Sequence, residues 1–322
     1  MSDNPSLIGL FVWGYDDADC YLWQTTGPMG RHGRLRFLQR ELDVDHVLCL
    51  TLPSSRRSEP NVSYLQKRLL KLRGKAHYRR EKTAMRFGFL QKDPSEITLL
   101  VYEPESAFGD EWYDAAHRMC GQVYGPDPRC THQIRLPATW SFAESASALL
   151  AESPPQIEDK PMDLVCVTSG TRTYPGHTDR LEFIARLRDV GVPLDLFGRG
   201  LDPKLGSSGS VNSKATPLRA AKLTLAIEND ASGEHYVSEK LWDPLLCWSL
   251  PLYYGSTAAD SMIPTDSFIR LPDLGEAGVQ AVRDALANPG LWAQRVEAIA
   301  EARKRILGEH NLMNWAERVM PV

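Results

Sequence analysis

The sequence has no long apolar run, no closely paired cysteines and no strong excess of charge, and each absence excludes a class of protein. Its apolar stretches all fall short of the roughly 20 residues that a membrane-spanning helix needs. The six cysteines are scattered without a CxxC pair, which favours reduced, buried thiols over a disulfide framework or a zinc site. A net charge of −4 argues against a surface devoted to nucleic acid or anionic membrane.

The N-terminal stretch also lacks the features of a targeting segment. MSDNPSLIGLFVWGYDD has no basic start and only a short apolar core, so we expect a first strand there in place of a signal peptide. Together with the cysteine pattern, this predicts a cytoplasmic protein without a membrane-anchoring stem. The 322 residues, 43% of them hydrophobic, suffice for two domains of ordinary size.

The first half has the pattern of a doubly wound α/β domain. Strand-like runs cover residues 7–13, 47–52 and 97–102. A glycine-rich turn at 27–33 precedes the segment RLRFLQREL, which we expect to be helical. A strand, a tight turn and a helix in this order begin such a domain.

A basic tract from Arg56 to Arg86 holds eleven Lys or Arg against two Glu. Leucines at helical spacing within it predict an amphipathic helix with a solvated basic face. The alternative is a docking surface for an anionic acceptor, or a peripheral contact with a membrane. Because the rest of the chain is acidic, we expect no nucleic-acid partner.

The second half alternates strands and helices more regularly. The sequence predicts strands at 163–168, 194–197, 223–228 and 250–254, and helices at 179–190, 237–247, 276–287 and 291–306. This alternation predicts a mainly parallel sheet whose ligands lie beyond the carboxyl ends of the strands.

A polar stretch at 146–160, with two adjacent prolines, predicts an extended linker between the domains. We therefore expect an N-terminal domain at 1–155 and a C-terminal domain at 156–305. The remainder, 306–322, is expected to cross back, with a last helix around 311–319.

The stretch LTLAIENDASGEHYVSEKLWDPLLCWSLPLYYG carries the most informative pattern. A buried strand ends in Glu228 and Asn229, and a short loop leads to Tyr236, Glu239 and Lys240. The last three have the i, i+3, i+4 spacing of one helical face, which predicts them together at a helix N-terminus. Such an end favours a pyrophosphate. The alternative, from the residues alone, is an ordinary helix start with a Glu–Lys pair.

Four sequence blocks resemble the donor-binding signature of the α-1,3-fucosyltransferase family, glycosyltransferase family 10. AIEN, YVSEKL, PLYYG and SFI occur in the family's order and at similar spacing, between Leu223 and Leu271. The resemblance implies an α/β fold of two Rossmann-like domains facing a cleft, the GT-B architecture, with the acceptor domain first. It also implies inverting transfer of fucose from GDP-fucose to a glycan hydroxyl.

Upstream, Asp179 and Glu182 have the spacing of a helix cap, which predicts that Arg180 lies in the first turn of a helix. An arginine there can clamp phosphate oxygens. In the family, an arginine at the start of the corresponding helix binds the donor diphosphate, and the resemblance matches Arg180 to it. Arg172 is the competing candidate.

Inverting transfer needs a general base on the acceptor side of the site. Glu103 follows the strand at 97–102, and Glu105 comes two residues later. The family has a catalytic glutamate after the equivalent strand, so Glu103 is the expected base and Glu105 its competitor, although the block YEPES keeps the family pattern only in part. We expect neither cofactor nor metal, because Arg180, Lys240 and a helix N-terminus would meet the charge of the leaving diphosphate.

Two other interpretations of the function stay open. A related inverting glycosyltransferase could use another nucleotide-sugar or a non-glycan acceptor, since one methyl or hydroxyl in a pocket is worth only ~1–3 kcal/mol of discrimination. A non-catalytic module would bind the nucleotide-sugar without turning it over.

Overall fold

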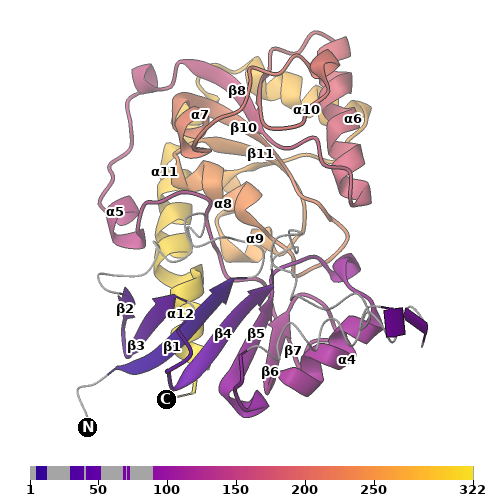
Figure 1. Ribbon diagram of the computed structural model, residues 1–322. Helices are drawn as coiled ribbons and strands as arrows, with labels where there is room; N and C mark the ends of the chain where they lie inside the picture. The colour runs from indigo at the N-terminus through magenta and orange to yellow at the C-terminus, as the bar shows by residue number, and fades with distance from the viewer. Residues whose placement is uncertain are drawn as a thin grey trace. The chain divides into compact units, whose positions relative to one another are not determined.

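The computed structural model describes residues 5–12, 30–39, 41–51, 68–69, 71–72 and 90–321. The chain forms two compact units, the first made of Met1–Leu136 with Met313–Val322 and the second of Pro137–Leu312 (Figure 1). Each unit is built on a sheet of mainly parallel strands. Among the described residues, none of the helices has the length and apolar composition needed to cross a bilayer.

The division between the units falls after Leu136, whereas the linker pattern predicted it after residue 155. The cause is Trp140, Phe142 and Leu149, which are all buried in the core of the second unit. The predicted extended linker also contains a short helix, α5 (Ala146–Leu150), because the Ser145 hydroxyl caps its first turn.

The last helix, α12 (Leu312–Val319), brings the end of the chain into the first unit. The helix agrees with the one predicted around 311–319, but the returning segment starts later than residue 306, because Ile306 and Leu307 pack in the second core. The side chain of Glu317 accepts a hydrogen bond from the Arg34 backbone at 3.0 Å. The end of the chain is therefore tied to the first sheet by polar contacts as well as by packing.

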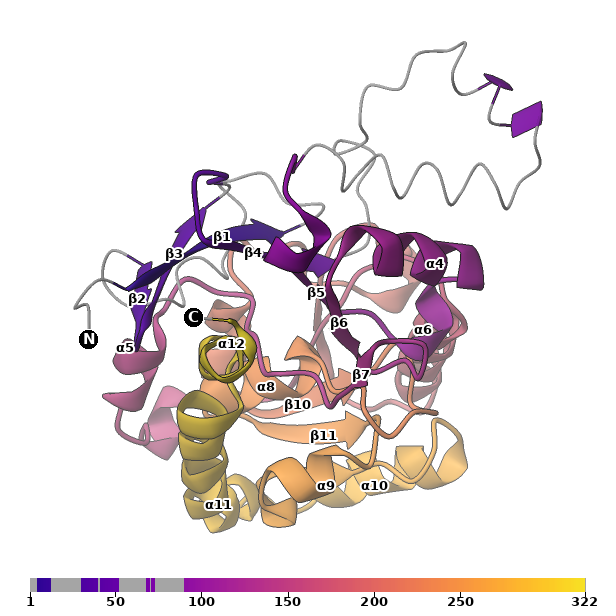
Figure 2. The same cartoon turned by 90° about the horizontal axis from the view of Figure 1, so that it is seen from below.

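Within the part of the chain that the structure describes, the first sheet has seven strands in the order β2-β3-β1-β4-β5-β6-β7, and only the β2–β3 pair is antiparallel. The helix α4 (Asp110–Met119) packs against β6 (Figure 2). Short 3-10 turns lie at Pro94–Glu96 and Glu105–Ala107. The strands are β1 (Ser6–Val12), β2 (Arg31–His32), β3 (Leu35–Gln39), β4 (His46–Thr51), β5 (Ile97–Val101), β6 (Gln122–Gly125) and β7 (His132–Gln133).

The segment RLRFLQREL, predicted to be helical, instead contains the strand β3. Leu35 and Phe37 are fully buried while Arg36 between them is not, which is the two-residue period of a strand. Parallel pairing with β1 supplies the backbone hydrogen bonds and overrides the local helical preference. The predicted basic helix at 56–86 lies outside the described residues, apart from 68–69 and 71–72.

The second sheet has five parallel strands in the order β12-β11-β10-β8-β9. The strands are β8 (Met162–Val167), β9 (Asp195–Phe197), β10 (Ala221–Ile227), β11 (Leu250–Tyr254) and β12 (Ile269–Arg270). The helices are α6 (Pro175–Asp189), α7 (Ala215–Ala220), α8 (Glu239–Leu246), α9 (Ala259–Met262), α10 (Glu276–Leu286) and α11 (Leu291–Arg305), with 3-10 or π turns at Ile157–Asp159, Pro203–Leu205, Thr265–Ser267 and Ile306–His310.

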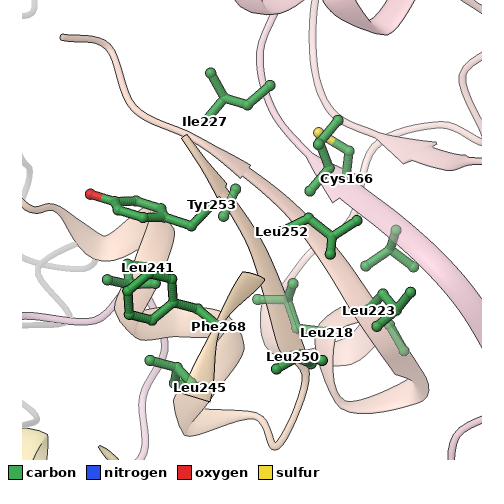
Figure 3. Close-up of a cluster of buried hydrophobic side chains, with 14 of the residues drawn as sticks. Cys166, Leu218, Leu223, Ile227, Leu241, Leu245, Leu250, Leu252, Tyr253 and Phe268 are labelled. Carbon is green, nitrogen blue, oxygen red and sulfur yellow. The ribbon is translucent and has the colours of Figure 1, made fainter. Parts of the chain in front are cut away.

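Helices cover both faces of this sheet, which makes its strands almost continuously apolar. Figure 1 shows α6 and α10 at one side of the sheet and α7, α8 and α11 at the other. In Figure 3, Leu250 and Leu252 of β11 lie in one cluster with Leu241 and Leu245, which are one turn apart on α8. This packing fixes the start of α8 close to the carboxyl ends of β10 and β11.

Candidate donor and base sites

The loops that follow β8, β9 and β10 approach one another closely at the carboxyl edge of the second sheet. A side chain on Gly170 would overlap the carbonyl oxygen of Gly200, and one on Gly176 would overlap that of Asn229. Glycine at these positions lets the start of α6 lie directly against the loop after β10. Ligands of parallel α/β sheets bind at this edge.

Glu228 follows β10 directly and is buried. Its carboxylate accepts hydrogen bonds from the Ser238 backbone N–H at 2.8 Å, the Ser238 hydroxyl at 2.5 Å and the Tyr253 hydroxyl at 3.4 Å. Burial raises the pKa of Glu228, while the nearby Lys240 ammonium and the Ser238 hydrogen bonds oppose that rise. Glu228 therefore ties the start of α8 to the end of β10.

The helix α8 begins at Glu239 with Ser238 as its N-cap. The prediction that Tyr236 shares a helical face with Glu239 and Lys240 is wrong, because Tyr236 lies before the cap. Glu228 accepts a hydrogen bond from the Ser238 backbone, and the Ser238 hydroxyl accepts one from the Lys240 backbone. These contacts make Ser238 the cap and set the helix start at Glu239. Tyr236 is buried in the loop that enters the helix.

Lys240 lies between two carboxylates. Its ammonium is 3.2 Å from a Glu239 carboxylate oxygen, 3.2 Å from the Ser238 hydroxyl and 3.8 Å from the Glu228 carboxylate. Burial by itself would raise the pKa of Glu239, but the Lys240 and Lys214 ammonium groups hold that pKa well below its usual range. Glu239 is thus an ionised, partly buried acid at the N-terminus of a helix.

Arg180 lies in the second turn of α6, and its predicted place in the first turn is wrong. The helix begins at Pro175, four residues before Asp179, because proline is favoured at the first helical position. The His177 ring accepts backbone hydrogen bonds from Thr173 and Tyr174 at 3.2 and 3.4 Å and satisfies the turn that enters the helix.

The buried guanidinium of Arg180 still reaches the carboxyl edge of the sheet. It donates to the Asn229 side chain at 2.9 Å and to the Ile227 carbonyl at 3.3 Å, and its Nε has no hydrogen-bond partner among the described residues. Burial and the charges of Arg180 and Lys240 together lower the pKa of His177. The contacts of Arg180 therefore anchor its guanidinium to the residues at the end of β10. The competing arginine, Arg172, is exposed in the loop.

Glu103 lies two residues after the end of β5 and is buried, whereas Glu105 opens the turn Glu105–Ala107 and is partly exposed. The loop that carries both acids is fastened by Arg129, which donates to the carbonyl oxygens of Glu105 at 3.2 Å and Phe108 at 3.0 Å. The buried carboxylate of Asp127 holds Arg129 in turn at 2.6 Å.

Residues missed by the sequence analysis include Arg129, Asp127, His177, Ser238, Lys214 and Asp243. Most of their partners lie far away in the sequence, so spacing gives no sign of the contacts. The contacts between Asp127 and Arg129, between His177 and Thr173, and between Ser238 and Lys240 are local. The described residues contain no group of three or more His, Cys, Asp or Glu arranged to hold a metal ion.

Residues 159–282 match the model of a known protein family, described as the C-terminal domain of glycosyltransferase family 10 (fucosyltransferase). This confirms the family resemblance for this part of the chain. The fucosyltransferase-like segment includes Arg180, Glu228, Tyr236 and Lys240, whereas Glu103 lies outside the match. No curated protein matches the chain as a whole.

The solved structures similar to this chain show its fold. An α-1,3-fucosyltransferase with GDP-fucose is 13% identical, with 97% of this chain and 93% of that chain covered and a TM-score of 0.51. An α-glucosyltransferase in complex with UDP and DNA is 10% identical, with 95% and 96% covered and a TM-score of 0.55. The N-terminal domain of Candida albicans trehalose-6-phosphate phosphatase is 10% identical, with 97% and 95% covered and a TM-score of 0.56. The predicted GT-B fold is confirmed by the glycosyltransferases among them.

Proposed function

We propose that this protein is an inverting glycosyltransferase that moves fucose from GDP-fucose to a hydroxyl of a glycan or glycoconjugate. The observation that carries the proposal is that two cations meet the residues at the end of β10, where Arg180 donates to Asn229 at 2.9 Å and the Lys240 ammonium lies 3.8 Å from Glu228. Both lie in the segment that matches the fucosyltransferase family. A solved structure with the same fold contains GDP-fucose.

The donor diphosphate would bind where positive charge is available. Arg180 and Lys240 supply two cations, and the first turn of α8 supplies backbone N–H groups and the positive end of the helix dipole. As the bond between sugar and phosphate breaks, negative charge grows on the leaving diphosphate, and these groups stabilise it. This arrangement supports a reaction that needs no metal or other cofactor.

The remaining donor residues take separate roles in the proposal. Glu239 is ionised and can accept hydrogen bonds from sugar hydroxyls. Tyr236 offers a ring and a hydroxyl in the loop before α8. Glu228 and Asn229 act through the protein itself, because Glu228 holds Ser238 and Asn229 holds Arg180.

The proton of the acceptor hydroxyl would go to Glu103. Its position after β5 corresponds to the residues that follow parallel strands at binding sites. Burial favours the neutral form of a carboxylic acid, so a desolvated Glu103 would be a stronger base than a solvated one. Glu105 is more exposed and is the second candidate. The five described free cysteines are buried, which supports action in a reducing compartment such as the cytoplasm.

A panel of nucleotide-sugars tests the proposal without knowledge of the acceptor. Purified protein is incubated with GDP-, UDP- and dTDP-sugars, and thermal shift and slow nucleotide release are measured. We expect stabilisation and release of GDP with GDP-fucose. A response to UDP- or dTDP-sugars alone would show that the donor is not GDP-fucose. Binding of GDP-fucose without release of GDP or transfer to any glycan would indicate a non-catalytic module.

A further inference from the structure

A lysine outside the four family blocks reaches the candidate donor site from the neighbouring helix. Lys214 is the N-cap residue of α7, which packs on α8. Its ammonium lies 3.5 Å from a carboxylate oxygen of Glu239, 3.7 Å from Asp243 and 3.3 Å from the Ser141 hydroxyl. Lys214 therefore joins two acids of α8 from outside that helix.

Asp243 is the buried member of this cluster. It lies one turn after Glu239, so both carboxylates project from the same face of α8. One of its oxygens accepts the Ser141 backbone N–H at 2.9 Å, and the other has no hydrogen-bond partner among the described residues. A buried carboxylate with an unsatisfied oxygen destabilises a fold. The cation that faces this oxygen is Lys214.

The acidic side chains around Glu239 outnumber the lysines that contact them. Lys240 is shared between Glu239 and Glu228, so it cannot balance both acids. Arg180 acts on Glu239 over a longer distance and is engaged by Asn229. With Asp243 included, three carboxylates on or beside α8 meet the two lysines Lys240 and Lys214. Without Lys214, the cations that act on Glu239 are Lys240, which also serves Glu228, and the more distant Arg180.

We propose that Lys214 is a positioning residue of the donor site, held by Asp243 and Ser141 so that its ammonium keeps the Glu239 carboxylate in place. This inference rests on the proposed function in assigning Glu239 to the sugar of the donor. The competing explanation is that Lys214 only fastens α7 to α8. In that case its loss lowers stability and leaves the ionisation of Glu239 unchanged.

The first experiment measures the ionisation of Glu239 without any ligand. The side-chain carboxyl of Glu239 is titrated by carbon NMR in the wild type, K214M and K214R, with E239Q for assignment. We expect a clear rise in the Glu239 pKa in K214M and near wild-type behaviour in K214R. An unchanged Glu239 titration in folded K214M overturns the inference, whatever the substrate is.

The second experiment separates the sugar from the nucleotide. GDP affinity is measured by calorimetry, and KM and kcat for GDP-fucose hydrolysis are measured across pH. We expect K214M to change GDP affinity by less than about twofold, to raise KM about tenfold and to move its acid limb to higher pH. The matched control is K222M, which removes another Lys–Asp pair of this unit, Lys222–Asp163 at 2.7 Å. We expect K222M to leave GDP affinity, KM and the pH profile unchanged.

The outcomes are distinguishable. A wild type that fails to bind GDP or to release it from GDP-fucose counts against the proposed function, while the NMR titration still decides the role of Lys214. Equal losses of GDP and GDP-fucose affinity in K214M would show that Lys214 contacts the nucleotide, which overturns the positioning role. A fall in melting temperature alone, with an unmoved pH profile, would leave Lys214 as a purely structural residue and also overturns it.

Discussion

Both units place a buried glutamate close to the end of a parallel strand, Glu228 immediately after β10 and Glu103 two residues after β5, and different groups fix the two loops. Glu228 receives three hydrogen bonds from Ser238 and Tyr253 and so connects β10 to α8. In the first unit the loop around Glu103 is held by Arg129 through backbone carbonyls. The same place on a sheet can thus carry either a structural carboxylate or a candidate base, depending on which groups fix the loop.

The largest expected effect separates the two acids of the first unit. E103Q should lower sugar transfer by about 10³-fold with unchanged GDP affinity, because the amide cannot accept the acceptor proton. Transfer is followed by product analysis, and GDP binding by calorimetry. The control E105Q should stay within a few-fold of wild type. Reversed magnitudes would make Glu105 the base.

The second prediction concerns the donor unit, where the loss should be in binding. K240M should weaken GDP binding by about 10–100-fold, since a hydrogen bond to a charged group contributes ~1.5–3 kcal/mol. Calorimetry with GDP measures the change. K222M provides the control, because Lys222 lies near the start of β10, at the opposite end of the strand from Glu228. Undiminished affinity in K240M would remove Lys240 from the diphosphate site.

The third prediction tests the fastening of the loop in the first unit. R129M should lower kcat about tenfold and leave GDP affinity unchanged, because the loop carrying Glu103 loses two hydrogen bonds to its carbonyls. Steady-state kinetics with saturating donor measure it. R118M, at an exposed position of α4, is the control. Wild-type kcat in folded R129M would show that Arg129 does not order the base.

The smallest expected effect is on stability and comes from Asp243. Burial raises the pKa of Asp243 to about 7, above its ordinary value of 3.8, with the Lys214 charge opposing the rise. The folded state then binds more protons than the unfolded state between these two values, so its stability falls as pH rises from about 4 to 7. The free energy of unfolding of D243N should fall less over this interval than that of the wild type, by about 1.4 kcal/mol for each unit by which the pKa is raised. Identical slopes in denaturant titrations would exclude a raised pKa.

The amino-acid sequence by itself determined the repeating βα pattern, most strand positions and the family of the second half. Buried parallel strands are apolar on both faces, so VLCLTL, DLVCVT and LTLAIE are recognisable without any partner. The blocks around Glu228 and Lys240 are short and contiguous, so their order can be recognised in the linear sequence. The apolar run at 97–102 likewise placed Glu103 close to the end of a strand.

Only the tertiary structure decided where α6 and α8 begin, that RLRFLQREL contains a strand, and where the two units divide. Each of these depends on contacts between residues far apart in sequence, such as Glu228 with Ser238, β3 with β1, and Trp140 with the second core. The same holds for Lys214, whose meeting with Glu239 follows from the packing of α7 on α8. Local spacing describes the faces of a helix once it exists, but burial and hydrogen bonds from distant segments choose its first residue.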